Sequence, residues 1–368
     1  MKDKLIIFSY DYPPSSGGIA RLMNEISIGA VGKFKEVIVL TKGKAGLQKY
    51  YNSNSVVKII YLSEYRFLTE ISAIRYLSKI EHKEQYYLIC GLWHPEVILA
   101  KLAGFKKINV LTHGTELLSG GSKFRENIWL SIYAKYSLNK VNIIANSMFT
   151  ADLSRRVSPK SIVSALPLAV NHRYFKPNLN KSNAKIIIGT VSRILQFKGH
   201  DFILETIKAL PLEYKEKIEW HVAGTGPYLQ VLKQDVVKYK LDSIVKLKGF
   251  IPDDKLAMFY SSLDLFILMT RESKTSANVE GFGLVFLEAQ SSVVPVIGTN
   301  TGGIPSAIEH KNGGWLIGQD DKKELLILLK KIINNKIILE SQGVKARNRV
   351  LRKCTWDEYN EKLFKLLR

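Results

Sequence analysis

The strongest constraint on the fold is an alternation of strand and helix patterns that runs through the chain twice. The first run has β-rich segments at 4–10, 36–41, 56–62, 87–90, 108–112 and 141–145. Helical patterns lie between them at 20–30, 71–84 and 96–103. The second run has strand patterns at 185–191, 218–223, 244–250, 263–269, 294–299 and 315–317. Such alternation favours a parallel sheet covered by helices on both faces.

The chain length points to two such domains. A chain of 368 residues exceeds one ordinary hydrophobic core. The segment 167–177, which contains Pro167 and Pro177, is typical of a linker. We therefore expect an α/β fold of two doubly wound, Rossmann-like domains, 1–177 and 178–351, with a ligand crevice at the carboxyl ends of their strands. The last helix, about 352–368, is expected to pack back on the first domain.

The charge balance narrows the possible partners. Lys and Arg number 54 against 33 Asp and Glu, a formal charge of +21. Residues 1–177 carry 25 basic and 12 acidic side chains (+13), and residues 178–368 carry the remaining 29 and 21 (+8). This field attracts an anionic membrane leaflet, phosphorylated substrates or nucleic acid. The alternative explanation is compositional drift, because proteins from AT-rich genomes commonly contain many lysines. No nucleic-acid-binding signature is present.

The chain has features of a cytoplasmic protein. The apolar run Leu5–Phe8 is too short for a signal peptide, and no run approaches the roughly 18 apolar residues of a membrane span. Cys90 and Cys354 are expected to be free thiols in a reducing compartment. We expect a cytoplasmic location, with peripheral contact at the anionic inner face of the membrane.

The segment 280–288 carries the clearest chemical signal. It begins with Glu280, continues through Phe282, Gly283 and Leu284, and ends at Glu288 inside a helical pattern. Backbone N–H groups at a helix N-terminus suit a phosphate, and glycine allows close approach of a ligand. The two glutamates can hold sugar hydroxyls on either side of a diphosphate. This layout suits a nucleotide sugar, and a capped helix with one solvated glutamate is the alternative.

Basic and histidine side chains also follow predicted strands. Arg193 and Lys198 flank the loop after strand 185–191, where two cations would neutralise a diphosphate leaving group. His113 follows strand 108–112 and is expected to contact substrate, with a purely structural role as the alternative.

Glycine pairs occur in two further loops. Gly17 and Gly18 lie in the first strand-to-helix turn, where doubly wound domains bind phosphate. Gly224 and Gly226 follow strand 218–223 and are a second candidate contact, although a tight turn explains them equally well. No cysteine cluster, His-x-x-x-His or Asp-x-Asp pattern is present, so we expect no metal and no cofactor.

The order and spacing of these motifs resemble the family 4 retaining glycosyltransferases of the GT-B fold over nearly the whole chain. The matching motifs are Gly17-Gly18, His113-Gly114-Thr115-Glu116, Asn146-Ser147, Ser192-Arg193 to Lys198-Gly199, Gly224-Thr225-Gly226-Pro227, and Glu280 with Glu288. The resemblance implies that Arg193 and Lys198 hold the donor diphosphate. It also implies that Glu280 lies beside the donor sugar, that Glu288 binds the ribose, and that His113 lies on the donor's other face.

Three positions depart from that pattern. Ala169-Val170-Asn171 stands where Gly-Val-Asp is common, and Thr225 stands where an aspartate is common. The segment 271–279 is longer than the usual loop before the first glutamate. In this it is similar to phosphatidylinositol mannosyltransferases and polysaccharide-assembly transferases, which indicates a lipid-linked acceptor.

The sequence thus predicts a metal-independent, retaining hexosyltransferase. Its donor would be a nucleotide diphosphate sugar, either GDP-mannose or a UDP-hexose. Its acceptor would be a glycan or a lipid-linked molecule in cell-surface polysaccharide or lipopolysaccharide assembly. A sugar-nucleotide epimerase and a non-catalytic sugar-nucleotide-binding partner share this architecture and are the alternatives, with a nucleic-acid-binding protein as the third.

Overall fold

The protein consists of two compact units. The computed structural model describes residues 4–15, 17–43, 57–65, 67–178, 184–273 and 278–368. Unit 1 comprises Met1–Leu166 and Trp356–Arg368, and unit 2 comprises Pro167–Thr355. The segment 167–177 packs within unit 2, where the carbonyl of Phe175 accepts hydrogen bonds from Ser291 Oγ (2.6 Å) and Arg347 Nη1 (3.0 Å).

Unit 1 is built on a seven-stranded parallel sheet in the order β3-β2-β1-β4-β5-β6-β7. The strands are β1 (Lys4–Phe8), β2 (Glu36–Lys42), β3 (Val57–Leu62), β4 (Tyr86–Cys90), β5 (Asn109–Thr112), β6 (Asn142–Ala145) and β7 (Ile162–Ala165). The strand order reverses between β1 and β4, whose residues pair in register from Lys4 with Tyr86 to Phe8 with Cys90. In such sheets the loops at this reversal point are where ligands bind.

The connections of unit 1 are mostly helical. The α-helices are α1 (Gly18–Gly29), α2 (Leu68–Ser78), α3 (Ile98–Leu102), α4 (Lys135–Leu138), α5 (Met148–Val157) and α14 (Trp356–Leu366). Short 3-10 turns lie at Lys83–Gln85 and Thr115–Leu117, and π-helical segments lie at Trp93–Val97 and Arg125–Ala134.

Unit 2 is built on a six-stranded parallel sheet in the order β10-β9-β8-β11-β12-β13. The strands are β8 (Ile186–Val191), β9 (Ile218–Ala223), β10 (Val245–Gly249), β11 (Leu265–Leu268), β12 (Val296–Thr299) and β13 (Gly314–Ile317). The order reverses between β8 and β11, as it does in unit 1. The two Rossmann-like sheets confirm the expected α/β class.

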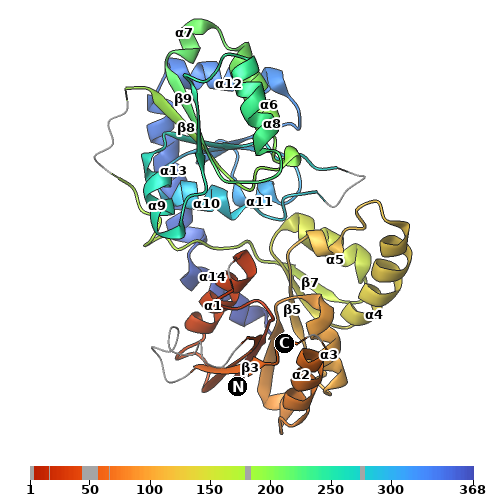
Figure 1. Ribbon diagram of the computed structural model, residues 1–368. Coiled ribbons are helices and arrows are strands. Elements are labelled where there is room, and N and C mark those ends of the chain that lie inside the picture. The colour runs from red at the N-terminus through yellow and green to blue at the C-terminus, as the bar shows by residue number, and fades with distance from the viewer. Residues whose placement is uncertain (1–3, 16, 44–56, 66, 179–183, 274–277) are drawn as a thin grey trace. The chain divides into compact units, whose positions relative to one another are not determined.

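Helices cover both faces of the second sheet. They are α6 (His200–Ala209), α7 (Leu212–Lys215), α8 (Leu229–Lys238), α9 (Asp253–Ser262), α10 (Leu284–Ser291), α11 (Ile304–Ala307), α12 (Lys322–Asn334) and α13 (Ile337–Lys353). Helices α6, α8 and α12 lie on one face, and α9, α10, α11 and α13 lie on the other (Figure 1). A 3-10 turn at Gln196–Lys198 precedes α6.

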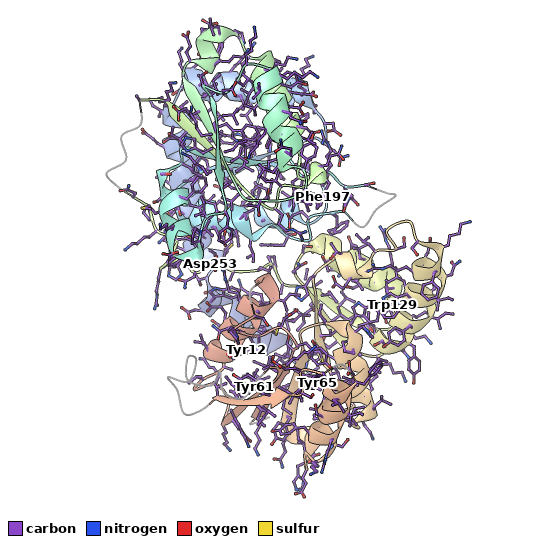
Figure 2. All side chains as sticks on the ribbon, viewed as in Figure 1. Tyr12, Tyr61, Tyr65, Trp129, Phe197 and Asp253 are labelled. Carbon is purple, nitrogen blue, oxygen red and sulfur yellow. The ribbon has the colours of Figure 1, made fainter. Side chains whose placement is uncertain are left out.

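Continuous apolar runs explain the central strands. Leu5–Phe8 in β1 and Leu265–Leu268 in β11 are fully buried, as parallel strands covered on both faces must be. Side chains fill the space between each sheet and its helices (Figure 2). In unit 2, buried Trp220 Nε1 donates to Thr190 Oγ1 (2.9 Å), which donates to the carbonyl of Ile267 (2.7 Å). The polar groups of Trp220 and Thr190 are therefore satisfied within this core.

The chain returns to unit 1 through its last helix, as the sequence predicts. Helix α14 lies beside α1 (Figure 1). Asn360 Nδ2 donates to the carbonyl of Glu25 (3.1 Å), and the rings of Phe34 and Phe364 meet edge to face at 5.1 Å. A Cβ on Gly29 would lie 2.0 Å from Asn360 Nδ2, so this glycine lets α14 approach α1 closely.

Two elements differ from the sequence prediction. The helix expected at 71–84 ends at Ser78, and His82 adopts a left-handed conformation (φ 50°) before a short 3-10 turn. Strand β7 was not predicted, because Ile162–Ala165 is a partly exposed edge strand without a continuous apolar run. Among the described residues, no helix combines the length and apolarity needed to cross a bilayer.

Candidate functional site

An ion pair joins two of the residues that the sequence singled out. Lys198 ends the 3-10 turn after β8, and Glu280 lies in the loop between β11 and α10. Lys198 Nζ lies 2.6 Å from Glu280 Oε2, and the two side chains are only 14% and 19% exposed. Because β8 and β11 are parallel neighbours, their following loops emerge side by side at the carboxyl edge of the sheet.

Glycines allow the backbones around this ion pair to touch. A Cβ on Gly199 would lie 2.0 Å from the carbonyl oxygen of Met269, and one on Gly303 would lie 1.8 Å from that of Gly281. The Gly303 N–H also donates to the carbonyl of Glu280 (2.8 Å). The loops carrying Lys198 and Glu280 are therefore held in place by backbone contacts that no larger residue permits.

The loop that carries Arg193 packs on the predicted glycines of the next loop. A Cβ on Gly224 would lie 1.9 Å from the Ser192 carbonyl oxygen, and one on Gly226 would lie 2.3 Å from that of Ile194. The Gly224 N–H already donates to the carbonyl of Gly249 (2.7 Å). The packing shows how these glycines shape the loop around Arg193.

Arg193 itself is exposed, and no residue in the described part of the chain pairs with its guanidinium. It therefore offers a planar pair of donors that an anion can engage without first breaking another contact.

The first turn of α10 begins directly after Gly283, which has a left-handed backbone (φ 93°). Phe282 is buried beside it, and Leu284 is the first helical residue. Glu288 lies further along α10, is buried, and accepts a hydrogen bond from Tyr260 Oη of α9 (2.8 Å). Glu280 and Glu288 thus have different surroundings, since Glu280 pairs with a cation and Glu288 with a hydroxyl.

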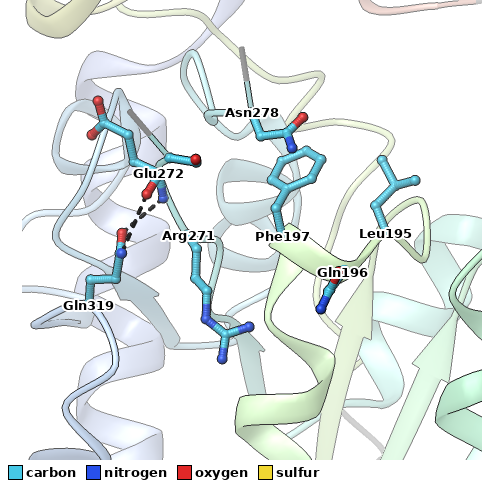
Figure 3. Close-up of a pocket in the computed structure, with 8 residues that line it drawn as sticks. Leu195, Gln196, Phe197, Arg271, Glu272, Asn278 and Gln319 are labelled. Carbon is cyan, nitrogen blue, oxygen red and sulfur yellow. Dashed lines mark hydrogen bonds between the residues drawn. The ribbon is translucent and has the colours of Figure 1, made fainter. Parts of the chain in front are cut away.

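A cavity of about 410 Å³ lies beside Phe197, the residue before Lys198 (Figure 3). It is formed by loops that follow β8, β11 and β13, and its lining residues are Leu195, Gln196, Phe197, Arg271, Glu272, Ser273, Asn278 and Gln319. The Phe197 ring connects the cavity to the ion pair, because Lys198 Nζ lies 5.1 Å from its centroid. The volume is within the usual range of small-molecule sites.

The polar contacts of this cavity were not visible in the sequence. Arg271 donates twice to Asp201 (2.8 Å each) and once to Asp320 (2.7 Å). The Glu272 N–H donates to Gln319 Oε1 (2.8 Å), as Figure 3 shows. Arg271 is thus neutralised by two carboxylates, and the remaining polar groups suit a hydroxylated ligand better than a phosphate. Of the long loop at 271–279, residues 274–277 lie outside the described residues.

In unit 1, the predicted histidine is fixed by its neighbours. His113 follows β5, and its Nε2 lies 2.9 Å from the carbonyl oxygen of Gly91. Because a carbonyl only accepts, Nε2 carries the hydrogen, and Nδ1 of the neutral ring is an acceptor. The backbone N–H of His113 donates to Glu116 Oε1 (2.5 Å).

The first glycine loop begins helix α1. Gly17 precedes the helix with φ 138°, and Gly18 is its first residue. A Cβ on Gly17 would meet no described atom within 4 Å, so its backbone faces open space. Ser16 lies outside the described residues.

The predicted residues therefore form two groups. Unit 2 holds Arg193, Lys198, Glu280 and Glu288, and unit 1 holds Gly17, Gly18 and His113. Each group lies at the carboxyl edge of its own sheet. In the described ranges, no three His, Cys, Asp or Glu side chains are grouped so that they could hold a metal ion.

Comparisons with known proteins show which sequences the chain resembles. Residues 172–349 match the family model of the glycosyl transferases group 1. A GDP-mannose-dependent alpha-(1-6)-phosphatidylinositol monomannoside mannosyltransferase of Mycobacterium tuberculosis is 23% identical over 99% of this chain and 98% of its own length. The putative colanic acid biosynthesis glycosyltransferase WcaL of Escherichia coli is 24% identical over 49% of this chain and 44% of its own.

A solved structure shares the fold over nearly the whole chain. Sucrose-phosphate synthase of Thermosynechococcus elongatus superimposes with a TM-score of 0.77 at 18% identity, covering 99% of this chain and 98% of that one. This likeness and the two Rossmann-like sheets show the two-domain GT-B fold. The family match over residues 172–349 and the full-length relative together support a group 1 glycosyltransferase.

Proposed function

We propose that this glycosyltransferase moves a hexose from a nucleotide diphosphate sugar to a glycan or lipid-linked acceptor in cell-surface polysaccharide or lipopolysaccharide assembly. The observation that carries the proposal is the Lys198–Glu280 ion pair at the carboxyl edge of the second sheet. GDP-mannose and a UDP-hexose both suit the site. The mannosyltransferase relative, named for GDP-mannose and phosphatidylinositol mannoside, supports the first donor and a lipid-linked acceptor.

The ion pair suggests how the donor is bound. Without a donor, Lys198 and Glu280 neutralise each other in a partly buried place. A diphosphate carries more charge than one carboxylate, so it attracts the ammonium group of Lys198 away from Glu280. Glu280 is then free to accept a hydrogen bond from a hydroxyl of the donor sugar. Arg193 adds a bidentate contact to the same diphosphate.

The same cations serve the reaction. As the bond to the sugar breaks, negative charge develops on the leaving diphosphate, and Lys198 and Arg193 stabilise it in the transition state. This role needs no divalent ion, which is why the proposal is metal-independent. Retention of configuration follows from the family resemblance, with the acceptor attacking the face that the diphosphate leaves within a short-lived ion pair.

Further groups of each unit have roles in the proposal. Glu288 would hold the ribose, with Tyr260 orienting its carboxylate through their 2.8 Å hydrogen bond. In unit 1, Nδ1 of His113 would accept a hydrogen bond from a hydroxyl of the sugar or the acceptor. The cavity beside Phe197 has neutral amides and a ring face, which suit a sugar of the acceptor.

Thermal shift with nucleoside diphosphates tests the donor site. At a concentration near 100 Kd, a ligand adds about 2.7 kcal/mol to the free energy of unfolding and raises Tm by several degrees. We expect one of GDP, UDP, ADP and dTDP to stabilise the protein, with the same shift in EDTA. If EDTA abolishes the shift, metal independence is wrong, and if none of the four stabilises the protein, the donor site is wrong.

Replacing the cation of the ion pair tests its catalytic role. Lys198→Ala should lower kcat/KM about 100- to 1,000-fold, because it removes a donor to the leaving group. The free energy of unfolding should fall by about 1–3 kcal/mol, because Glu280 is left unpaired in a partly buried place. Lys233→Ala, at an exposed lysine of α8, is the control and should change neither quantity. A large loss of stability with unchanged kcat would contradict the assignment.

The alternatives of the same architecture predict other products. An epimerase would convert the nucleotide sugar without an acceptor and keep the sugar on the nucleotide. A non-catalytic partner would bind the nucleotide and release none of its sugar to any acceptor or to water. Chromatography of the nucleotide products separates these cases from transfer.

We also propose peripheral contact with an anionic membrane. Four apolar side chains recur every fourth residue along 124–136 in unit 1 and are between 48% and 71% exposed: Phe124, Ile128, Ile132 and Tyr136. Exposed Lys123 and Lys135 flank this stripe. Beneath it, Trp129, labelled in Figure 2, packs against the ring of Tyr133 at 4.8 Å. Apolar side chains among lysines suit the surface of an anionic bilayer.

Vesicle binding tests the membrane proposal. The double variant Phe124→Ser/Ile132→Ser should bind vesicles with phosphatidylglycerol at least about tenfold more weakly, because each apolar side chain contributes about 1.5–3 kcal/mol when buried. Ile327→Ser, at an exposed position of α12, is the control and should bind normally. Binding should weaken with salt. Equal binding of wild type to neutral vesicles in high salt would count against the proposal.

A further inference from the structure

A fully buried carboxyl group lies at the reversal point of the first sheet. Glu96 follows β4 and is 0% exposed. Its Oε1 accepts the N–H of Tyr10 (3.0 Å), and its Oε2 accepts the N–H of Leu92 (2.6 Å). No lysine or arginine in the part of unit 1 that the structure describes pairs with it. Burial of an unpaired carboxylate is costly, so this placement calls for an explanation.

The two N–H groups come from different loops. Tyr10 belongs to the loop after β1 that leads to Gly17 and Gly18, and Leu92 belongs to the loop after β4. These strands are adjacent and parallel. A single carboxylate therefore ties together the two loops at the place where doubly wound sheets bind their ligands.

The loop after β4 also contacts the predicted histidine, His113, through a hydrogen bond. Gly91 precedes Leu92, and its carbonyl oxygen lies 2.9 Å from His113 Nε2. A Cβ on Gly91 would lie 2.4 Å from Ser9 Oγ and 3.5 Å from Glu96 Oε2, so this position is tightly enclosed. A continuous set of contacts thus runs from Tyr10 through Glu96 and Gly91 to His113.

We infer that Glu96 is a positioning residue, whose ionised carboxylate fixes the glycine loop after β1 and, through Gly91, the ring of His113. It does not contact the donor or the acceptor itself. The inference rests on the proposed function, in which His113 binds a substrate hydroxyl, and on the expectation that the loop of Gly17 and Gly18 binds phosphate. Only a carboxylate presents two acceptors to two N–H groups, because a glutamine amide would place an N–H₂ against one of them.

The groups around Glu96 make its hold depend on pH. The pKa of Glu96 is raised to about 8, chiefly by burial and also by the negative charge of Asp11, against the N–H groups of Tyr10, Leu92 and Gly91, which lower it. Cys90 and the side chain of Tyr10 also face this carboxyl. A proton on one oxygen leaves a good acceptor for only one N–H. The two loops are therefore held together above about pH 8 and loosened below it.

Ionisation of Glu96 has opposite effects on the two loops and on the free energy of unfolding. The folded-state pKa of Glu96 is raised above its usual value of 4.5. Its contribution to stability is fully present below about pH 4.5 and is lost as the pH rises through about 8. Ionised Glu96 thus lowers the stability of unit 1 in the same pH range in which it holds the loops.

The test compares Glu96→Gln with Glu96→Asp, which keeps a carboxylate, and with Glu81→Gln, which makes the same substitution at an exposed position. In Glu96→Gln, hydrogen exchange of peptides containing Tyr10 and Leu92 should be about 10- to 100-fold faster at pH 9. Its Tm relative to wild type should rise between pH 5 and pH 8.5. Wild-type kcat should rise between pH 7 and pH 9, Glu96→Gln should lack this rise, and Glu96→Asp should retain it.

Exchange rates and a pH profile in Glu96→Gln that equal those of Glu81→Gln would overturn the inference. If Glu96→Gln does not fold, wild type alone decides, because exchange at Tyr10 and Leu92, corrected for intrinsic rates, should slow between pH 7 and pH 9. No slowing would equally overturn it. Absence of transfer by wild type would contradict the proposed function, while the exchange and Tm results still decide whether Glu96 holds the loops.

Discussion

The contact between Lys198 and Glu280 is the interaction on which the second unit's site depends. It exists because β8 and β11 are parallel neighbours and because glycines let the loops after them touch. At 2.6 Å the two side chains neutralise each other. Neither charge is therefore available until an anion with a larger charge, such as a diphosphate, binds Lys198. The site thereby avoids an unpaired partly buried charge in the absence of donor.

Both units fix the loops at the reversal point of their sheet, but they use different interactions to do so. Both sheets reverse their strand order beside the first strand of the unit, and both need loops fixed at that point. In unit 2 a cation and a carboxylate hold each other across two loops, whereas in unit 1 the carboxylate of Glu96 holds backbone N–H groups. The second arrangement is sensitive to a proton at a pH where Lys and Arg stay charged. The chain's large positive charge therefore says little about these two arrangements, which depend on individual side chains such as Lys198, Glu280 and Glu96.

The sequence predicted what depends on local pattern and missed what depends on pairing between distant segments. Strands such as β1 and β11 were evident because strands covered on both faces read as continuous apolar runs. The candidate glutamates followed from their place after a strand. The pairing of Lys198 with Glu280 spans 82 residues and needs the strand order, which no local pattern contains. Glu96 was missed because a single glutamate after His94-Pro95 has no signal until its burial is known.

The most direct test of the central claim is the affinity of the nucleoside diphosphate for Glu280→Gln, measured by titration calorimetry beside wild type. If Lys198 must leave Glu280 to bind the diphosphate, neutralising Glu280 removes a competitor. The account then predicts tighter binding by about fivefold, which corresponds to roughly 1 kcal/mol for a partly buried ion pair. Unchanged or weaker binding would show that Lys198 does not exchange between the two anions, and would contradict the account.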